Sequence, residues 1–392
     1  MRFSANYVYT GNNSFLKNGI IEVNSEGRII KVIDTQGAPI ELSSMQYFNG
    51  ILVPGFVNTH CHLELSHLKD KLPTSLGMRK FIETIPSIRQ TDPKLKAKQI
   101  KTQDAIMFSN GIKAVADISN TCDTIAVKKE SPIFYHSFME VFGIHPAKAE
   151  AALLNARTNL NAFQNAGLSA SITPHASYSL SQQLWDFFNN SNQIISIHNQ
   201  ESKAEKKLFG TKSGDMAEFV KHISPNTNIA NYYHKESALK FILNKLNPQN
   251  KTLFVHNVFT TEEDIAVANE FCKPENLYWS FCPNSNIYIE GEMPNLSLFL
   301  NKNQNITIGT DSLASNTKLS VLAELITIQE HFPKISLDKL LDWATINGAN
   351  FLGLEKNLGT IEPGKKPGLN LITGVDLHNL KLRPDSKVKV IL

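Results

Sequence analysis

Two histidines, His60 and His62, follow an apolar run in the segment VPGFVNTHCHLELSHL at residues 53–68. Because alternate residues of a strand point to the same side, both imidazoles would face one side of a strand that ends there, with Cys61 turned into the core. Two imidazoles at this spacing are typical ligands of a divalent metal. Paired histidines on a surface turn often have no function, so the pair by itself leaves both interpretations open.

Three more apolar runs end in an ionisable residue: His198 in SIHNQES, His256 in FVHNVF and Asp311 in IGTDSLASN. One such residue often only caps the next helix, but the same feature at several strand ends indicates a shared site. Neutral imidazoles with a carboxylate suit Zn²⁺ or Fe²⁺ and not Mg²⁺ or Ca²⁺. A metal with an open position there lowers the pKa of bound water to about 7 and makes hydroxide available.

The elements that must position these residues alternate along the chain. Eight short apolar runs alternate with helical stretches, and this order predicts an α/β fold, a (β/α)8 barrel of the TIM type, with its active site at the C-terminal strand ends. Two helix starts resemble capping boxes, Ser179 with Gln182 and Thr260 with Glu263. The eight runs are residues 51–60, 112–119, 133–143, 168–177, 193–200, 252–258, 276–286 and 306–312.

Both ends of the chain have a different pattern. Residues 19–33, GIIEVNSEGRIIKVI, predict a hairpin around a polar turn, and the tail GTIEPGKKPGLNLI at 359–372 returns to strands and turns. Each piece is too small to stand alone. We therefore expect residues 1–49 and 359–392 to form one small β-sandwich domain beside a metal-dependent hydrolase barrel at 50–358.

Composition limits the partners. The 392 residues are 42% hydrophobic and 19% charged, with a net charge of only +3, which gives no reason to expect nucleic acid or a membrane as a partner. The basic stretch KLKAKQIK at 94–101 fits the solvated face of a helix with Leu95 and Ile100 turned inward. The scattered cysteines indicate thiols, and neither a signal peptide nor a membrane span is expected. These features predict a soluble cytoplasmic protein that acts on a small molecule, with a homodimer left open.

Several segments in order resemble the amidohydrolase superfamily, in the branch of cytosine, guanine and S-adenosylhomocysteine deaminases and s-triazine chlorohydrolases. PGFVNTHCH is similar to its first-strand motif and HNQE at 198–201 to its fifth-strand HxxE. VHN at 255–257, CPNSN at 282–286, GTDSLASN at 309–316 and GTIEPGK at 359–365 also resemble family segments, so the resemblance covers nearly the whole chain.

The resemblance implies roles for these residues. Glu201 would be the proton shuttle, and His256 would hydrogen-bond the attacking water or the reacting group without being a full ligand. Asp311 would act in catalysis as well as hold the metal. Dinuclear members use a carboxylated lysine on the fourth strand, and LSASITPHAS offers none, so one metal is expected. The implied metal ligands are His60, His62, His198 and Asp311.

Further residues are candidates for contacts with the substrate. His175 resembles a substrate-contacting histidine of nucleoside-type deaminases, or it caps the helix near Ser179. Arg79 follows the first strand and can meet a substrate carboxylate or lie in solvent. Asn286 is expected on the pocket side. Glu64 and His67 can line the pocket or only brace it, and the role of His145 is left open.

The implied function is a metal-dependent hydrolytic deaminase, acting on carbon–nitrogen bonds other than peptide bonds. It would release ammonia from an aminated purine-, pterin- or nucleoside-like base, with S-adenosylhomocysteine and aminodeoxyfutalosine as substrate types to test first. Glu201 favours deamination because a proton must reach a ring nitrogen. The alternatives are hydrolysis of a non-amino group, as by a chlorohydrolase or cyclic amidohydrolase, and a non-catalytic scaffold, which the complete ligand set argues against.

Overall fold

A computed structural model describes residues 1–38, 44–225, 228, 232–233 and 236–392, and their fold is mixed α/β. The parallel strands form two four-stranded sheets, β6-β7-β8-β9 and β10-β11-β12-β13. Single parallel bridges, Ala176 to His198 and Cys61 to Asp311, link the edges of these sheets. The eight strands are β6 Phe56–Cys61, β7 Ile112–Ser119, β8 Phe134–Val141, β9 Ser169–Pro174, β10 Ile194–Asn199, β11 Lys251–His256, β12 Leu277–Phe281 and β13 Asn305–Ile308.

The parallel strands are buried on both faces. All six residues of β6 are buried, as are seven of the eight in β7, where only Lys113 is partly exposed. Near-continuous apolar strands of this kind are typical of parallel sheets whose faces are both covered. Polar residues inside these strands, such as Asn58 and Thr59 of β6, are buried too and bond to other buried side chains.

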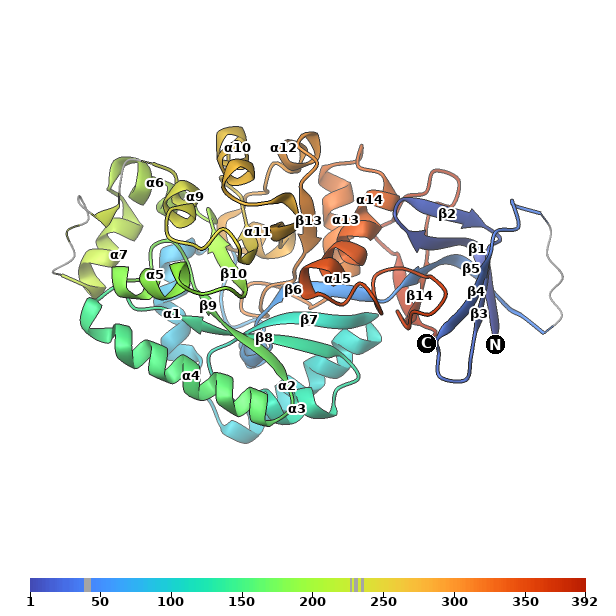
Figure 1. Ribbon diagram of the computed structural model, residues 1–392, viewed down its shortest axis with the longest axis horizontal. Helices are drawn as coiled ribbons and strands as arrows, with labels where there is room; N and C mark the ends of the chain where they lie inside the picture. Colours follow the sequence, from blue (N-terminus) through green and yellow to red (C-terminus); the bar gives the residue numbers. More distant parts are fainter. Residues whose placement is uncertain (39–43, 226–227, 229–231, 234–235) are drawn as a thin grey trace.

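Helices connect the strands and cover the sheets (Figure 1). The longest are α2 and α4, and the Asp92 side chain caps α2 by accepting from the amides of Lys94 and Leu95. The helices are α1 Met78–Ile88, α2 Pro93–Ser109, α3 Ile125–Glu130, α4 Ala149–Asn165, α5 Gln182–Asn189, α6 Lys203–Thr211, α7 Asp215–Ile223, α9 Ala238–Leu243, α10 Glu262–Phe271, α11 Pro283–Glu290, α12 Leu296–Asn301, α13 Val321–His331, α14 Leu337–Ala344 and α15 Ile346–Leu352, with the short 3₁₀ helices η1 Leu63–Leu68, η2 Pro146–Lys148 and η3 Pro274–Asn276.

Both predicted capping boxes are wrong in register. The box of α10 is formed by Thr261 and Asp264, one residue later than predicted, because the Asp264 side chain also reaches the Thr261 amide. Helix α5 starts after Ser181, whose side chain makes no capping bond, whereas Ser179 bonds to His175. Neighbouring polar residues look equivalent in a sequence, and only the backbone decides which one caps.

The two ends of the chain meet in one seven-stranded sheet, of order β15-β14-β5-β1-β3-β4 with β2 paired to β1 (Figure 1). The predicted hairpin at 19–33 is present as the antiparallel pair β3–β4. The strands are β1 Arg2–Gly11, β2 Ser14–Lys17, β3 Ile20–Val23, β4 Ile29–Ile33, β5 Gln46–Pro54, β14 Leu369–Thr373 and β15 Lys387–Val390.

The apolar run predicted as one strand at 51–60 is divided between two sheets. Strand β5 ends at Pro54 in the terminal sheet, and β6 starts at Phe56 in the parallel sheet. Gly55 stands at the break, where a Cβ atom would lie 2.2 Å from Lys113 and 2.7 Å from the Pro367 carbonyl. Close backbone approach requires glycine there, and the predicted domain boundary at residue 50 falls inside β5.

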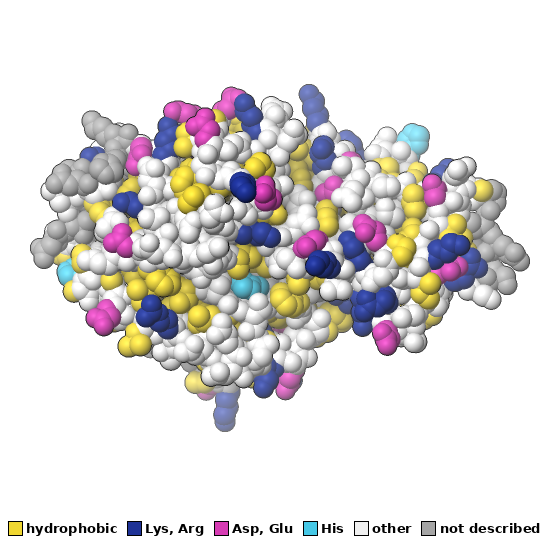
Figure 2. All heavy atoms as spheres, viewed as in Figure 1, with side chains coloured by type: hydrophobic (Ala, Val, Ile, Leu, Met, Phe, Trp, Pro, Cys, Tyr) yellow, Lys and Arg dark blue, Asp and Glu magenta, His cyan; other side chains and the backbone are white. Residues whose placement is uncertain are grey.

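The basic stretch at 94–101, the cysteines and the surface charge were also predicted from the sequence, and one of these predictions is partly wrong. Helix α2 turns Ile100 into the core, but Leu95 is exposed, because it precedes the first full turn that packs inward. All four cysteines are free, and Cys61 is fully buried. Among the described residues, no helix is long and apolar enough to cross a membrane. On the face drawn in Figure 2, basic and acidic side chains are interspersed over the whole length of the molecule.

Candidate metal and catalytic site

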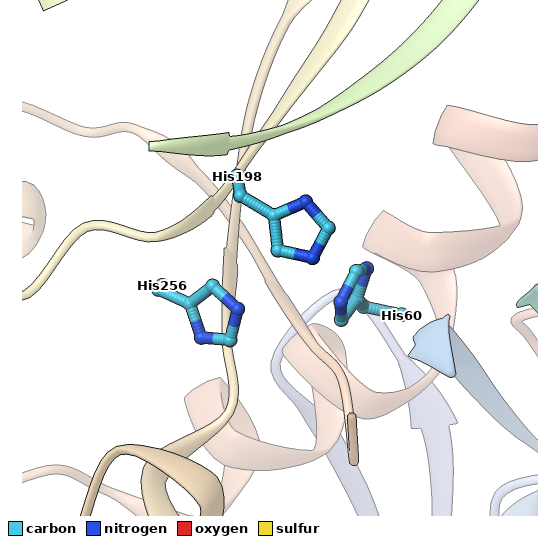
Figure 3. Close-up of side chains that lie close together, drawn as sticks. All are labelled: His60, His198 and His256. Atoms are coloured by element: carbon cyan, nitrogen blue, oxygen red, sulfur yellow. The ribbon is translucent and has the colours of Figure 1, made fainter. Parts of the chain in front are cut away.

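The ionisable residues at the strand ends converge on one place. His60, His198 and His256 come from β6, β10 and β11, and their rings point toward one another (Figure 3). One ligand atom from each of these three side chains lies within 4.8 Å of the others. His62 Nε2 is 3.3 Å from His60 Nε2, so the pair at alternate positions faces one side as its spacing predicts.

Asp311 completes the cluster with one carboxylate oxygen. Its Oδ2 accepts from the Ser285 and Ser315 hydroxyls at 2.6 and 2.7 Å. Oδ1 is left facing the imidazoles, 3.5 Å from His62 Nε2 and 3.8 Å from His60 Nε2. Burial alone would raise the pKa of Asp311, but the neighbouring imidazoles and hydroxyls hold it below its ordinary value, so the carboxylate is ionised.

The imidazoles of His60, His198 and His256 are neutral. Burial, the largest cause, lowers the pKa of His198 to about 4 and that of His256 to about 3, and it lowers the pKa of His60 well below the usual value. Neutral imidazoles have a lone pair available for a cation. An ionised carboxylate beside them supplies the compensating charge.

The hydrogen bonds of His198 leave one ring nitrogen available. Nδ1 lies 2.9 Å from the backbone carbonyl oxygen of His175, which can only accept, so Nδ1 carries the proton. Nε2 therefore holds the lone pair. Metal-ligating histidines typically donate their other N–H to a backbone carbonyl or a carboxylate in this way.

His256 has the opposite tautomer. The Asn286 amide nitrogen, which can only donate, is 3.0 Å from His256 Nδ1, so Nδ1 accepts and Nε2 carries the proton. That Nε2 is 3.4 Å from Glu201 Oε1. Asn286 was expected on the pocket side; it is buried on α11 and orients His256 instead of lining the cavity.

Glu201 is buried beside the cluster. Its pKa is raised well above the ordinary value by burial first, and then by the nearby charges of Asp311 and Glu205. Its backbone amide donates to Glu205 Oε2 at 2.9 Å, and Ser177 donates to the other Glu205 oxygen. The side chain is thus held at the edge of the cluster in an environment that favours a protonated carboxyl group.

The backbone is strained where the functional residues lie. His256 has a φ of 76° and Asp311 a φ of 55°, in the left-handed region that non-glycine residues rarely adopt. Gly309 passes so close to His60 that a Cβ atom would lie 2.6 Å from the His60 Cβ. Strain of this kind persists where the surrounding structure imposes it and is common at functional sites.

The donor set fits one divalent metal. Imidazole nitrogens of His60, His62 and His198 and the free oxygen of Asp311 are the ligand types that Zn²⁺ and Fe²⁺ prefer. Two imidazole nitrogens only 3.3 Å apart, with an anionic oxygen beside both, are better explained as ligand atoms around a cation than as partners of one another.

A cavity of about 680 Å³ opens above the cluster. His62, His198, Glu201 and Asp311 form part of its lining, and Glu64, His145 and His175 line it too. One side is apolar and comes from α1 and α7. This side consists of Met78, Phe81, Ile82, Ile85 and Pro86 from α1 with Phe219 and Ile223 from α7.

Two candidates lie outside the cavity. Arg79 is not among its lining residues; its Nε pairs with Glu83 Oε1 at 3.0 Å, one turn along α1. The guanidinium therefore does not reach the site where a substrate carboxylate was expected to bind. His67 braces the structure by a bond from its ring to the Arg89 carbonyl at 2.9 Å.

His175 both lines the cavity and bonds to Ser179, so the predicted substrate contact and the predicted helix cap are compatible.

Among the polar residues that line the cavity, Arg89 and Glu140 are two that the sequence patterns did not reveal. Arg89 lines it and donates to Glu64 Oε1 at 2.7 Å. Glu140 lies near the end of β8 and also lines it. The run IFYHSFMEVFG carries the acidic residue at the strand end, a signal equal to those of the other strands. Arg89 lies beyond a helix, and nothing in the sequence shows how the chain turns there.

Known proteins resemble this chain over most of its length. A profile of the amidohydrolase family matches residues 51–390. An adenosine deaminase of Helicobacter pylori is 27% identical over 358 residues, covering 88% of this chain and 85% of that protein. An aminodeoxyfutalosine deaminase of Nitratiruptor is 27% identical over 335 residues, covering 83% and 79%. A crystal structure of Helicobacter pylori aminofutalosine deaminase with methylthio-coformycin has the same fold, with a TM-score of 0.78 at 22% identity over 95% of this chain and 91% of that one.

Proposed function

The chain belongs to the amidohydrolase family, and from that premise we propose that it is a metal-dependent hydrolytic deaminase of adenine-type nucleosides. The observation that carries the proposal is the position of Glu201 against His256 at the buried end of a large cavity. Deamination needs a proton on a ring nitrogen, and Glu201 is the acid that can supply it. The relatives named above act on adenosine and aminodeoxyfutalosine, which share this base.

We assign one divalent metal, Zn²⁺ before Fe²⁺, to a single site. Strand β9 offers no lysine that could bridge two metals. A bound divalent metal acidifies water, so that a hydroxide nucleophile is available near neutral pH. The residues that would hold the metal are His60, His62, His198 and Asp311.

Asp311, Glu201 and His256 hold and transfer the protons of the reaction. Asp311 keeps Oδ2 occupied by two serines and presents Oδ1, so the base that takes the proton of water is fixed in position. Glu201 donates to the ring nitrogen next to the amino-bearing carbon. His256 donates from Nε2 and orients the attacking water. The oxygen of water forms a bond to the amino-bearing carbon, and the amino group takes the proton held by Asp311 and leaves as ammonia when the carbon–nitrogen bond breaks. The remaining hydroxyl proton returns to Glu201 as the carbonyl forms.

The cavity supports a nucleoside with an apolar group at the 5′ position. Its polar end is at the cluster, where the base would react. Its other side, from α1 and α7, is mainly apolar, with Glu83 and His222 as the polar residues of these helices in the lining. A volume of about 680 Å³ exceeds what adenosine alone fills. We therefore expect 5′-deoxyadenosine, 5′-methylthioadenosine or aminodeoxyfutalosine to be better substrates than adenosine.

The same proposal extends to the architecture. We infer that the two parallel sheets close into one (β/α)8 barrel, because single bridges link β9 to β10 and β6 to the segment after β13. We place the border between the barrel and the terminal β domain at Gly55. A cytoplasmic enzyme that acts on a small molecule, as a monomer or homodimer, remains our expectation.

The test measures ammonia release together with metal content. The purified chain is incubated with adenosine, 5′-methylthioadenosine, S-adenosylhomocysteine, aminodeoxyfutalosine, guanine and a pterin, and bound Zn and Fe are counted. We expect release from the adenine nucleosides, about one metal per chain, and loss of activity after chelation that returns with Zn²⁺. Activity only on a chlorinated triazine or a cyclic amide, or full activity without metal, would refute the proposal.

A further inference from the structure

Glu140 presents a buried acceptor to the cavity. Its side chain is only 4% exposed, and it lines the cavity near the end of β8. The Asn120 amide donates to Oε2 at 3.1 Å, while Oε1 has no hydrogen-bond partner among the described residues. A buried carboxylate oxygen without a donor is costly, so a donor is expected from a molecule that enters the cavity.

The nearest protein group does not supply that donor. His198 Nδ1 is 3.5 Å from Glu140 Oε1, but its proton is engaged by the His175 carbonyl at 2.9 Å. A second metal is also disfavoured. Glu140, His175 and His198 have one ligand atom each within 4.8 Å of one another, but His198 Nδ1 has no lone pair free in this tautomer. The two groups that remain are too few for a metal site.

A second acceptor lies beside Glu140. The Ser179 hydroxyl donates to the Ala176 carbonyl at 3.0 Å, so it accepts from His175 Nδ1, also at 3.0 Å. With its proton on Nδ1, His175 presents Nε2 as an acceptor. Glu140 Oε1 and His175 Nε2 are thus two neighbouring acceptors, and they match a ligand with two neighbouring hydrogen-bond donors. The vicinal hydroxyls of a ribose are such a pair of donors.

The position agrees with such a contact. His198 directs Nδ1 toward Glu140 and its other nitrogen toward His60 and the cluster (Figure 3). One imidazole ring therefore separates Glu140 from the reacting end of the cavity. A base that reacts at the cluster would place its sugar, and not its amino group, near Glu140.

We propose that Glu140 is a specificity-determining residue that accepts a hydrogen bond from a ribose hydroxyl of the substrate, with His175 as the second acceptor. This proposal rests on the proposed deaminase function. It means that the enzyme selects nucleosides with both ribose hydroxyls and discriminates against 2′- or 3′-deoxynucleosides, which leave the Glu140 oxygen unpaired.

The experiment compares two proteins on three substrates. Wild type and Glu140→Gln are assayed with adenosine, 2′-deoxyadenosine and 3′-deoxyadenosine, and bound metal is measured in both. Wild type should prefer adenosine over at least one deoxy analogue by about 10- to 100-fold in kcat/KM. Glu140→Gln should reduce that preference to within about five-fold, mainly by losing activity on adenosine, and should keep its metal.

Controls separate this role from a structural one. Glu218→Gln changes an exposed glutamate outside the cavity lining, one that pairs with Lys221, and should keep the preference. Glu140→Asp keeps a carboxylate but shortens the side chain by one methylene group, which moves the acceptor away from the sugar. It tests the same contact if Glu140→Gln does not fold. Equal losses on all three substrates would overturn the role of Glu140 and leave the deaminase standing. A second bound metal that Glu140→Gln removes would also overturn it. No ammonia from any ribonucleoside would overturn both proposals.

Discussion

The catalytic floor and the apolar wall of the cavity are built in different ways. The floor is the cluster of His60, His62, His198, His256, Glu201 and Asp311, of which His62, His198, Glu201 and Asp311 line the cavity directly. The wall consists of Met78, Phe81, Ile82, Ile85, Phe219 and Ile223. Every floor side chain is buried and stands at or just after a strand, and two of these residues have strained backbones. The wall comes from two helices, and Ile223 is 39% exposed.

This difference indicates separate tasks. Floor residues are fixed by bonds from their neighbours, such as Asn286 to His256 and Ser285 to Asp311, so their positions tolerate little change. Wall residues contribute only apolar surface, which can change in shape while the chemistry remains. We therefore expect changes in the floor to lower kcat for every substrate, and changes in the wall to alter the choice among substrates.

The largest effect should follow from Glu201→Gln. The amide keeps the shape of the side chain but cannot pass a proton to the ring nitrogen. We expect kcat to fall by about 10²- to 10⁴-fold with the metal content unchanged, measured as ammonia release on adenosine and 5′-methylthioadenosine. Both substrates should lose equally. Activity within a few-fold of wild type would remove Glu201 from the mechanism, and Glu218→Gln, on the surface of α7, is the matched control.

An intermediate effect should follow from Phe219→Ala in the wall. Loss of the ring removes apolar contact with a 5′ substituent and leaves the floor intact. KM for 5′-methylthioadenosine should rise by about 3- to 10-fold while adenosine changes by less than about two-fold. Phe271→Ala on α10, a half-buried phenylalanine outside the cavity, controls for general destabilisation. An equal loss on both substrates would contradict the division between floor and wall.

The smallest effect should follow from Arg79→Met. This arginine pairs with Glu83 on the surface of α1, and such a pair is worth only about 0.3–0.5 kcal/mol. The ratio of kcat/KM for S-adenosylhomocysteine to that for 5′-methylthioadenosine should stay within about two-fold of wild type. Arg89→Met, at the arginine that does line the cavity, is the informative contrast. A selective loss on the carboxylated substrate in Arg79→Met would return Arg79 to the substrate site.

Most of the candidate site could be predicted because its signals are local. Alternation along a strand places His60 and His62 on one face, and an apolar run that ends in His198 or His256 shows where a strand stops. The terminal hairpin was equally readable. The boundaries of the elements could not be predicted in the same way. The run at 51–60 is broken at Gly55, and Asn286 lies on a helix and not on a strand.

The sequence by itself determined which donors are present and in what order the strands present them, since residue type and strand period are properties of short segments. Only the tertiary structure decided which of them meet. It turned Arg89 and not Arg79 into the cavity, and it set Asn286 against His256 and so fixed a tautomer. It also left one oxygen of Glu140 without a partner in the part of the chain that the structure describes. These outcomes depend on contacts between residues far apart in the chain, and no local pattern encodes such a contact.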